Sequence, residues 1–304
     1  MKASSSKLLI ILAFFAIYVI WGSTYLFNKI AVTEIPALYL AAVRFSLAGL
    51  LIMGIAKLLK MPLHITKAQL INSTIAGFLF LVYGNGVFVW ALNYLDSGFA
   101  ALLASTQPLA VLILMRIVDN KKVKTKSVIG IVLGLIGMYL LVSQNSIIAK
   151  EGTVLGVFMI ITCVFSWSYG SIFVSKANLP KNFFVSTGYQ MLSASIILAL
   201  CSFCFGETWV SPLEWSRPVQ WSLLFLIVFG GIVAFTAFNY LLKNVSTDKV
   251  ASSAYVNPVI AMILGWLVLD ETLTQQSLIA AGVLLTGVYF IASRKEKRSV
   301  KSKI

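Results

Sequence analysis

The chain has 304 residues, of which 59% are Ala, Val, Ile, Leu, Met, Phe, Trp, Tyr or Cys and only 11% are charged. An ordinary soluble domain is roughly 45–50% apolar and about 25% charged, so this composition excludes a soluble globule. The apolar residues form ten runs, each close to the roughly 20 residues that cross a bilayer. The runs are 8–28, 37–56, 70–92, 99–118, 127–143, 153–174, 183–205, 221–242, 250–269 and 277–293. The sequence therefore predicts an all-α membrane protein with ten transmembrane helices and no soluble domain.

The net charge of +14 indicates an orientation. Lys and Arg collect in the cytoplasmic loops of polytopic proteins. With the N-terminus inside, 20 basic residues fall on the cytoplasmic side, whereas only Lys29, Lys150 and Arg217 fall on the other. We therefore expect a multi-pass protein of the cytoplasmic (inner) membrane with both termini cytoplasmic. Topology and contact with anionic lipid account for the basic C-terminal tail, so no nucleic-acid partner is expected.

The chain contains an internal repeat. Residues 95–142 resemble residues 245–292 at a fixed offset of 150 without a gap, and earlier positions correspond at an offset of 146. The matched pairs include Pro108 with Pro258, Ala101 with Ala251, Gly137 with Gly287, Tyr139 with Tyr289, Trp21 with Trp167, and Arg44 with Gln190. We interpret the chain as a duplicated five-helix unit, with the first repeat in residues 1–146 and the second in residues 147–304.

The two repeats are predicted to lie upside down relative to each other. Because five is odd, a second five-helix unit enters the membrane in the opposite sense, as in many secondary transporters. The loop RIVDNKKVKTK (116–126) of the first repeat aligns with WLVLDETLTQQ (266–276) of the second, so a basic loop corresponds to an acidic one. Homologous loops on opposite sides of a membrane are expected to differ in this way.

Paired prolines within spans point to a polar site. Pro108 and Pro258 lie at equivalent depths, and each follows an amide residue, Gln107 or Asn257. A proline inside a helix frees a carbonyl that lipid cannot satisfy, so these segments are predicted to face a cavity at the repeat interface. The alternative is a packing kink capped by the amide.

Further polar and aromatic groups in the spans complete the predicted site. The third span contains Tyr83-Gly84-Asn85-Gly86, and the eighth contains Gly230-Gly231 followed by Asn239. Polar groups are expensive against lipid, and aromatic rings with a few polar groups are typical of small-molecule sites. Trp and Tyr also mark membrane interfaces, which is the alternative for each. The predicted substrate-binding residues are Trp21, Tyr25, Tyr83, Asn85, Trp90, Gln107, Pro108, Trp167, Tyr169, Phe238, Asn239, Tyr255, Asn257 and Pro258.

Arg44 is the charged residue that lies clearly inside a span. Binding a substrate carboxylate is one interpretation. The other is structural, with the side chain reaching the headgroups or capping helix carbonyls. The structural role is favoured because the second repeat has Gln190 at the equivalent position. Gly130-x-x-x-Gly134 is a close-packing motif that fits a contact either within the chain or between protomers.

The sequence contains no constellation of catalytic or metal-ligating residues, so neither an enzyme nor a bound cofactor is predicted. The carboxylates nearest the spans are Asp96, Asp248, Asp270 and Glu271, and all lie at span ends. We therefore predict no buried protonatable carboxylate. Transport would then run down the solute's own gradient, by exchange, or with an ion held by backbone carbonyls.

The sequence resembles the drug/metabolite transporter superfamily and, within it, the EamA family of ten-helix bacterial permeases. The matching residues are Trp21-Gly22-Ser23-Thr24, Arg44-Phe45, Ser97-Gly98-Phe99-Ala100-Ala101-Leu102, Gln107-Pro108, Ser166-Trp167, Tyr255-Val256-Asn257-Pro258 and Asp270-Glu271. The resemblance implies a central cavity lined by the first, third, fourth, sixth, eighth and ninth helices, with the fifth and tenth at the periphery. It also implies export of a small metabolite or drug without specifying which.

We therefore expect a secondary transporter that exports a small organic metabolite or drug-like compound by alternating access, as a monomer or homodimer. An amino-acid (zwitterion) exporter is the alternative within transport and would use Arg44 with Gln107 or Asn257. A non-transporting scaffold or receptor is the alternative of another class. A water-accessible central pocket of a few hundred cubic ångströms favours transport, whereas a dry packed core favours the scaffold.

Overall fold

The computed structural model describes residues 2–95, 100, 103–120, 125–143, 152–268 and 275–292. Several residues of the sequence analysis lie outside this part of the chain. They are Asp96 to Phe99, Ala101, Leu102, Lys121, Lys122, Lys124, Lys150, Asp270, Glu271 and the basic C-terminal tail. Within the described part the secondary structure is helical throughout, without a strand.

Long helices cross the molecule in turn, several of them with a π-helical segment (η) inside. In the first half they are α1 (Lys2–Phe15), η1 (Ala16–Ile20), α2 (Trp21–Ala31), α3 (Ala37–Leu58), α4 (Lys67–Gly77), η2 (Phe78–Val87), α5 (Phe88–Ala91), α7 (Gln107–Asp119) and α8 (Thr125–Val142). In the second half they are α9 (Thr153–Lys176), α10 (Phe183–Cys204), α11 (Arg217–Phe225), η3 (Leu226–Phe235), α12 (Thr236–Asn244), α13 (Thr247–Ala251), α14 (Ser253–Val268) and α15 (Gln275–Ala292).

Polar side chains cap the N-terminal ends of α4 and α10. Thr66 and Gln69 form a capping box at the start of α4, and the Asn182 side chain accepts from the backbone N–H groups of Phe184 and Val185 at the start of α10. These bonds satisfy donors that have no partner within the helix.

Length and apolar composition qualify seven of the described helical stretches as membrane spans. They are Lys7–Ala31, Ala37–Leu58, Lys67–Ala91, Thr153–Lys176, Phe183–Cys204, Arg217–Asn244 and Thr247–Val268. Three shorter apolar stretches accompany them, Gln107–Val118, Val128–Gly137 and Leu278–Gly287. The prediction of an all-α membrane protein is confirmed.

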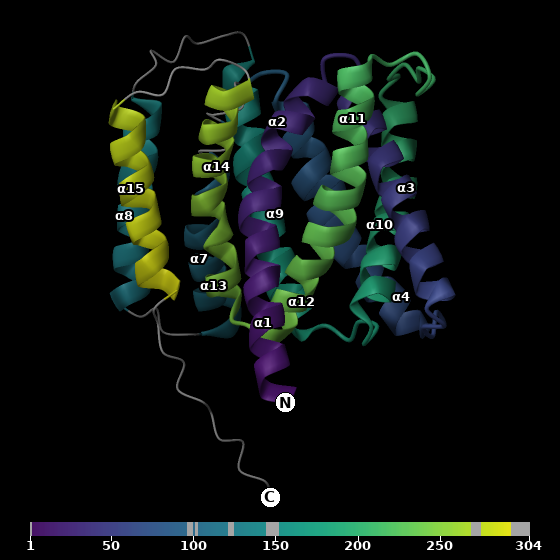
Figure 1. The fold of residues 1–304 in the computed structure, drawn as a ribbon, viewed down its shortest axis with the longest axis horizontal. Coiled ribbons are helices and arrows are strands. Elements are labelled where there is room, and N and C mark those ends of the chain that lie inside the picture. The colour runs from purple at the N-terminus through teal and green to yellow at the C-terminus, as the bar shows by residue number, and fades with distance from the viewer. Residues whose placement is uncertain are drawn as a thin grey trace, which may run out of the picture.

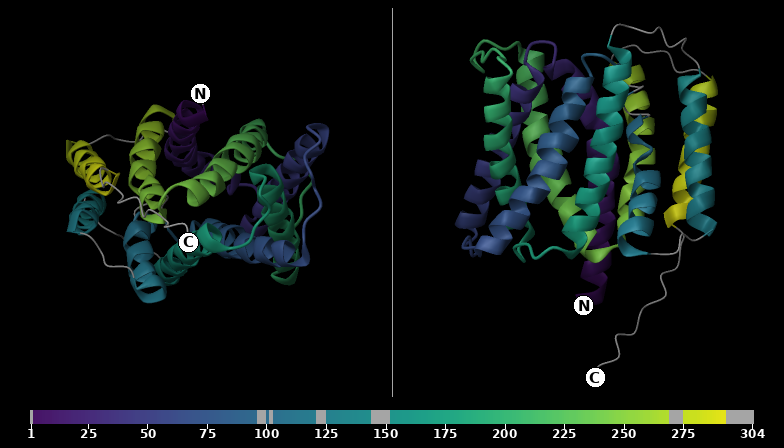
Figure 2. Two further views of the ribbon diagram at one scale, coloured as in Figure 1. Left: turned by 90° about the horizontal axis from the view of Figure 1, so that it is seen from below. Right: turned by 180° about the vertical axis from the view of Figure 1, so that it is seen from behind.

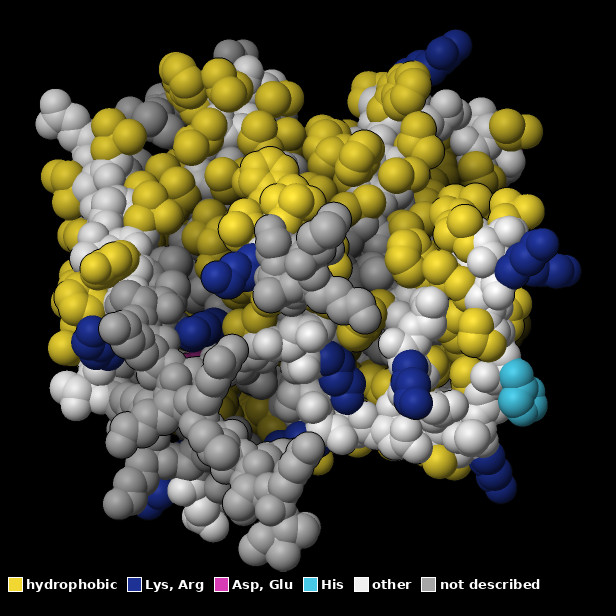
Figure 3. Space-filling view, turned by 60° about the horizontal axis from the view of Figure 1, so that its bottom comes forward, with side chains coloured by type: hydrophobic (Ala, Val, Ile, Leu, Met, Phe, Trp, Pro, Cys, Tyr) yellow, Lys and Arg dark blue, Asp and Glu magenta, His cyan; other side chains and the backbone are white. Residues whose placement is uncertain are grey.

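The helices stand side by side, with the start of α1 and the end of α15 on the same side of the bundle, called here the side of the termini (Figure 1). The pair α8 and α15 lies at one end, whereas α3 and α10 pack together toward the other (Figures 1 and 2). Lys and Arg side chains are spread over the face on the side of the termini, together with the one His (Figure 3).

Glycines hold α8 and α15 together. A Cβ atom at Gly287 of α15 would lie 2.8 Å from the carbonyl oxygen of Gly130 and 3.2 Å from the backbone nitrogen of Gly134. The two backbones can approach this closely because no side chain separates them. The GxxxG motif of residues 130–134 is therefore used within the chain.

This packing gives the first testable expectation. Gly287→Ala places a methyl group against backbone that cannot yield, and we expect a loss of roughly 1–3 kcal/mol of stability, as in overpacked cores. Gly282→Ala on the same helix is the matched control because a Cβ there meets nothing within 4 Å. Thermal unfolding of the purified variants measures the difference, and equal melting temperatures would contradict the packing.

The loop between α10 and α11 is fastened to the start of α3. The carboxylate of Glu207 accepts from the backbone N–H groups of Leu38 and Tyr39 at 3.1 and 2.7 Å, and from the hydroxyl of Ser202 at 2.7 Å. The Tyr39 ring stacks on Trp209, with centroids 5.1 Å apart. Glu207 therefore caps a helix of one half of the chain from the other half.

We expect Glu207→Ala to destabilise the protein by roughly 1–3 kcal/mol, because it leaves two helix N–H groups and a hydroxyl without their acceptor. Glu214→Ala, in the exposed part of the same loop, is the control. The readout is again the melting temperature. A variant at position 207 as stable as the control would show that this cap contributes nothing.

A second hydrogen bond links the α10–α11 loop to the α2–α3 loop, and here the donor belongs to the α10–α11 loop. The backbone N–H of Ser216 donates to the Glu34 carboxylate at 2.9 Å. Hydrogen bonds from the Ser216 side chain and backbone hold the pKa of Glu34 below its ordinary value. The bond is therefore stabilising above the ordinary carboxyl pKa and is lost as the pH falls through the lowered value. Glu34 is fully exposed, so its influence is small.

Candidate functional site

A central pocket lies where the halves of the chain meet, with about 120 Å³ open to the centres of water molecules. Its walls come from α2, α3, η2, α5, α7, α9, η3 and α14. The lining residues are Trp21, Thr24, Tyr25, Asn28, Arg44, Phe45, Leu81, Gly84, Asn85, Phe88, Leu92, Ala104, Gln107, Cys163, Val164, Trp167, Gly230, Phe235, Ser253 and Asn257. The walls are mostly apolar with a few polar groups, which is typical of a small-molecule site.

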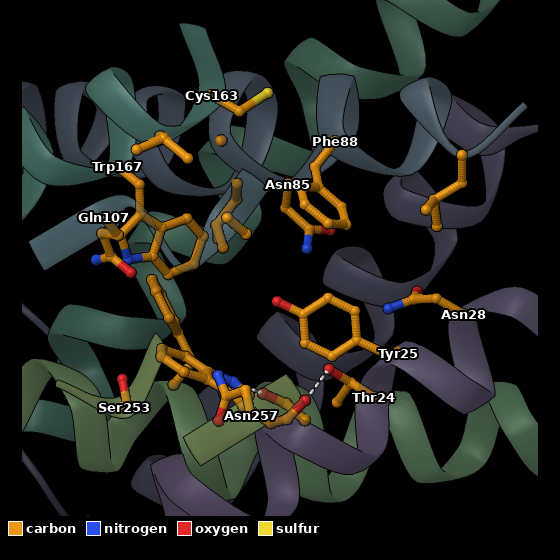
Figure 4. A pocket seen from close by; sticks show the side chains of 18 of the residues that line it. Thr24, Tyr25, Asn28, Asn85, Phe88, Gln107, Cys163, Trp167, Ser253 and Asn257 are labelled. Carbon is orange, nitrogen blue, oxygen red and sulfur yellow. Dashed lines mark hydrogen bonds between the residues drawn. The ribbon is translucent and has the colours of Figure 1, made fainter. Parts of the chain in front are cut away.

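The structure brings together six of the predicted site residues. Trp21, Tyr25, Asn85, Gln107, Trp167 and Asn257 all line this pocket. Tyr25 of the first span and Asn85 and Phe88 of the third point towards one open space, and Trp167 stands across it (Figure 4).

An aromatic layer formed by Trp21, Phe80, Trp167 and Phe238 packs against the pocket. The Trp21 ring lies 5.6 Å from Trp167 and 4.9 Å from Phe238 between centroids. Phe80 lies 5.0 Å from Trp167 and 5.4 Å from Phe238. The two tryptophans that correspond in the internal repeat therefore meet at the centre of the molecule. Trp21 and Trp167 of this layer also line the pocket, whereas Phe80 and Phe238 do not.

A second cavity lies on the side of the termini, with about 350 Å³ open to the centres of water molecules. Its walls come from the end of α9, the start of α10, the segment between them, and α12. Asn239 lines this cavity, whereas the adjacent Phe238 belongs to the aromatic layer. The second cavity and the aromatic layer are therefore adjacent through these two residues of α12.

Each half of the chain donates hydrogen bonds to a π-helical segment of the other. Ser166 and Cys163 of α9 donate to the carbonyls of Leu79 and Tyr83 in η2, at 2.8 and 3.2 Å. A π-helix frees carbonyls from the regular helical pattern, and such segments are frequent at functional sites. In this molecule the freed carbonyls are satisfied by a facing helix and not by lipid.

The corresponding bonds to η3 come from the first half. The Trp21 indole N–H donates to the Gly230 carbonyl at 3.2 Å, and Nε of Arg44 donates to the Leu226 carbonyl at 3.3 Å. The halves are thus joined at the pocket by reciprocal polar contacts.

Asn257 fastens the ninth predicted span to the first. With its amide oriented so that both polar atoms are satisfied, Nδ2 donates to the carbonyls of Ser253, Ile17 and Tyr18, each at 3.1 Å. The Tyr18 hydroxyl also bonds the hydroxyl of Ser252 at 2.9 Å. Asn257 is therefore both a lining residue and a link between helices.

Arg44 forms part of the pocket wall and is only 4% exposed. Its guanidinium carbon lies 4.9 Å from the centroid of the Phe45 ring. A Cβ at Gly230 would lie 3.1 Å from Nη2, so this glycine makes room for the charged group. The side chain is thus directed into the bundle and does not reach the headgroups, which removes one of the structural interpretations.

Two amide oxygens at the pocket lack partners. Oδ1 of Asn28 and Oδ1 of Asn85 are buried without a hydrogen bond among the described residues, and both residues line the pocket. A buried acceptor without a partner is costly, so these oxygens are suited to receive N–H or O–H groups from a bound solute.

The other predicted site residues lie outside the pocket. Phe238 is in the aromatic layer, and Asn239 lines the second cavity while bonding Gln190, Thr187 and the Phe235 carbonyl. Tyr255 packs against Gly134 of α8.

Three further predicted aromatic residues, Tyr83, Trp90 and Tyr169, do not line the pocket. Tyr169 is 43% exposed, Tyr83 packs near Phe78, and Trp90 packs against Phe205. Aromatic type alone does not distinguish these positions from lining ones, because rings also serve helix packing and interfaces.

Pro108 lies near the start of a helix and not in its interior. Ser105 and Thr106 form a turn, and α7 begins at Gln107 with Pro108 in its first turn. There a proline removes no intrahelical hydrogen bond, since the N–H has no partner at that position. The prediction that Pro108 frees a carbonyl is therefore wrong. Pro258 does lie inside α14, as predicted, but not at the pocket surface.

A buried carboxylate was also missed. Asp248 in α13 is only 2% exposed, because this short helix folds inward before α14 begins. The prediction that no carboxylate is buried is therefore wrong. Asp248 does not line the central pocket.

Several lining residues were missed although helical spacing could have found them. Thr24 and Asn28 follow Trp21 at intervals of three and seven, and Cys163 and Ser253 precede Trp167 and Asn257 by four. Residues at these intervals share a helix face.

The model of the EamA-like transporter family matches residues 8–143 and again residues 154–293. The chain belongs to this family. It is 35% identical over 286 residues to the uncharacterized inner membrane transporter YedA of Escherichia coli K12, covering 93% of this chain and 90% of that one. This EamA-family chain is a multi-pass inner membrane transporter.

Other relatives are more distant. The uncharacterized transporter YoaV of Bacillus subtilis is 22% identical, with 96% of this chain and 99% of that one covered. A probable amino-acid metabolite efflux pump of Escherichia coli K12 is 25% identical, with 90% and 91% covered. One crystal structure superposes with a TM-score of 0.75 at 18% identity, covering 92% of this chain and 94% of that chain, which shows the shared fold.

Proposed function

We propose that the protein is a ten-helix secondary transporter that exports a small organic metabolite or drug-like compound by alternating access. Two inverted five-helix repeats, residues 1–146 and 147–304, would rock about the central pocket. The observation that carries this proposal is a central pocket lined by both halves of the chain, whose aromatic layer continues through Phe238 to the adjacent Asn239 of a second cavity. A solute bound in the pocket reaches the other side only when that layer opens.

The aromatic layer has the composition expected of such a gate. It is built from rings of both halves, Trp21 and Phe80 from one and Trp167 and Phe238 from the other. A movement of one half against the other therefore separates the rings. The π-helical segments beside the layer supply backbone that is already irregular, where a helix bends at low cost.

An amino-acid exporter is the second proposal. The relative named as a probable amino-acid metabolite efflux pump favours it, and so does the position of Arg44 in the pocket wall. A scaffold or receptor is less favoured because the lining keeps unpaired amide oxygens at an open pocket. The described part of one chain supplies the whole proposed site, so it fits a monomer as well as a homodimer in lipid.

The proposed orientation places both termini in the cytoplasm and makes a labelling prediction. In a background without the native cysteines, Glu214→Cys is expected to react with a membrane-impermeant thiol reagent from outside, and His64→Cys only after permeabilisation. Both positions are exposed and lie in loops at opposite ends of the helices. Labelling of both from one side would contradict the topology.

Transport itself is tested in proteoliposomes loaded in turn with a panel of small organic metabolites. Efflux above protein-free vesicles, saturating with concentration, is the expected result. An imposed pH step then tests the energy source. Accumulation driven by the step in the wild type, and lost in Asp248→Asn, would overturn transport down the solute's own gradient and make that buried carboxylate the proton site.

A further inference from the structure

The described residues use only part of the hydrogen-bonding capacity of Arg44. Nε makes one bond to the Leu226 carbonyl, and the other guanidinium nitrogens make no hydrogen bond to the described residues. A guanidinium carries five N–H donors in a planar fork. Most of that fork is therefore available at the wall of the central pocket.

From this we propose that Arg44 is an anion subsite, and that the transported solute carries a carboxylate that binds the guanidinium. The inference rests on the proposed transport function and specifies the substrate class of the same pocket. The apolar body of the solute would lie among Tyr25, Phe88 and Trp167, which face the same open space (Figure 4).

No described carboxylate neutralises the charge of Arg44. Four carboxylates have described side chains, and none forms an ion pair with Arg44. Glu34 and Glu207 bind backbone N–H groups in the loops, Glu214 lies in an exposed loop, and Asp248 lies outside the pocket. A buried charge without a counter-ion is strongly unfavourable. A bound anion removes that cost.

The shape of the Arg44 guanidinium group also favours a carboxylate ligand. The guanidinium fork binds a carboxylate through two parallel hydrogen bonds, which a lone carbonyl does not offer. Gly230 leaves space beside Nη2 that any other residue would fill. The ring of the adjacent Phe45 lies against the guanidinium group, with its centroid 4.9 Å from the guanidinium carbon. The charged end is thus held in one place before a solute arrives.

The position equivalent to Arg44 in the second repeat holds an uncharged residue. Gln190, at the position that corresponds to Arg44, is fully buried and donates to Ser186 and Asn239. In the second half this position therefore supports a neutral network and does not line the central pocket. The fold does not require a charge here, so the charge of Arg44 points to a ligand.

The amide oxygens of Asn28 and Asn85, which have no hydrogen-bond donor among the described residues, are further polar groups of the pocket. They accept hydrogen bonds, and neither Asp nor Glu is among the lining residues. A cation without a carboxylate would meet Arg44 and be repelled. The pocket is therefore expected to prefer an organic carboxylate over a neutral or cationic molecule of the same shape.

The test uses the purified full-length protein in lipid nanodiscs and three probes with one aromatic body. They are 3-phenylpropionate, 3-phenylpropionamide and 3-phenylpropylamine, and titration calorimetry gives each dissociation constant. We expect the carboxylate to bind at least tenfold more tightly than the amide, and the amine to bind most weakly. Absence of carboxylate binding at millimolar concentration, or equal binding of carboxylate and amide, would overturn the proposal.

Variants then assign the preference to one residue. Arg44→Gln copies the second repeat and is expected to weaken carboxylate binding at least tenfold while leaving amide binding unchanged. Arg116→Gln, at the exposed end of α7, is the matched loss of charge and is expected to bind like the wild type. If Arg44→Gln does not fold, the comparison of three probes on the wild type decides alone.

A double-mutant cycle tests whether Arg44 forms a structural ion pair with Asp96. Asp96 lies outside the described residues, and a pair between Asp96 and Arg44 would appear as coupling between Arg44→Gln and Asp96→Asn in melting temperature. We expect no coupling, and strong coupling would overturn the anion subsite. Carboxylate binding without translocation in vesicles would preserve the subsite and refute the proposed transport, whereas translocation unaffected by Arg44→Gln would do the reverse.

Discussion

Asn257→Ala is expected to abolish transport and also to lower the melting temperature. The variant removes three hydrogen bonds from Nδ2, and two of them reach carbonyls of η1 in the first span. The carbonyls of Ile17 and Tyr18 in the first span then lose a donor that reaches them from the ninth span. We expect a loss of roughly 1–3 kcal/mol.

Two matched variants separate the roles of this amide. Gln107→Ala removes an amide that lines the pocket without a hydrogen bond to the described residues, so it is expected to reduce transport with little change in stability. Asn244→Ala removes an amide bonded to the Tyr240 carbonyl at an exposed helix end and is expected to change neither. An Asn257→Ala protein with the wild-type melting temperature would contradict the link between the first and ninth spans.

Trp167→Ala is expected to reduce transport at least tenfold, because Trp167 stands at the centre of the aromatic layer. Its ring contacts Trp21, Phe80 and Phe238, and the backbone of Gly84 approaches it so closely that a Cβ there would lie 2.8 Å from the indole. With the proposed gate, removal of the ring is expected to join the two cavities and to open a passive path. Large-to-small changes at such sites cost roughly 3–5 kcal/mol in soluble proteins.

The measurements are solute efflux and solute leak in the same vesicles. Trp167→Phe keeps a ring and is expected to retain most of the activity, whereas Trp221→Ala removes a tryptophan that is 64% exposed and is expected to behave like the wild type. A Trp167→Ala protein that transports normally, with no added leak, would show that the layer is not the barrier.

Hydrophobic runs predicted the fold class, because the bilayer imposes one length and one composition on every span. The family resemblance was carried by short motifs around Trp21, Gln107 and Asn257, and it is confirmed by the family match. All three residues line the central pocket. Each combines a polar atom with a position inside an apolar run, which is the signal that the membrane makes informative.

Other features depend on contacts that the sequence does not express. The break before Gln107 removes the kink that was predicted at Pro108, because α7 begins there with Thr106 as its N-cap residue. The π-helical segments depend on partners such as Ser166 and Arg44 from the other half of the chain. Asn239 was assigned to the site by its type, but its neighbours turn it toward the second cavity.

Alternating access is tested most directly by the side from which residue 104 can be reached. Ala104 lines the central pocket, and Ala177 lines the second cavity. Each is replaced by Cys in a background without native cysteines, and an impermeant thiol reagent is applied to oriented vesicles with and without a transported solute. Alternating access predicts that Ala104→Cys reacts from outside and Ala177→Cys from inside, with the solute changing the two rates in opposite directions. Simultaneous access to Ala104→Cys from both sides, or rates that the solute leaves unchanged, would contradict it.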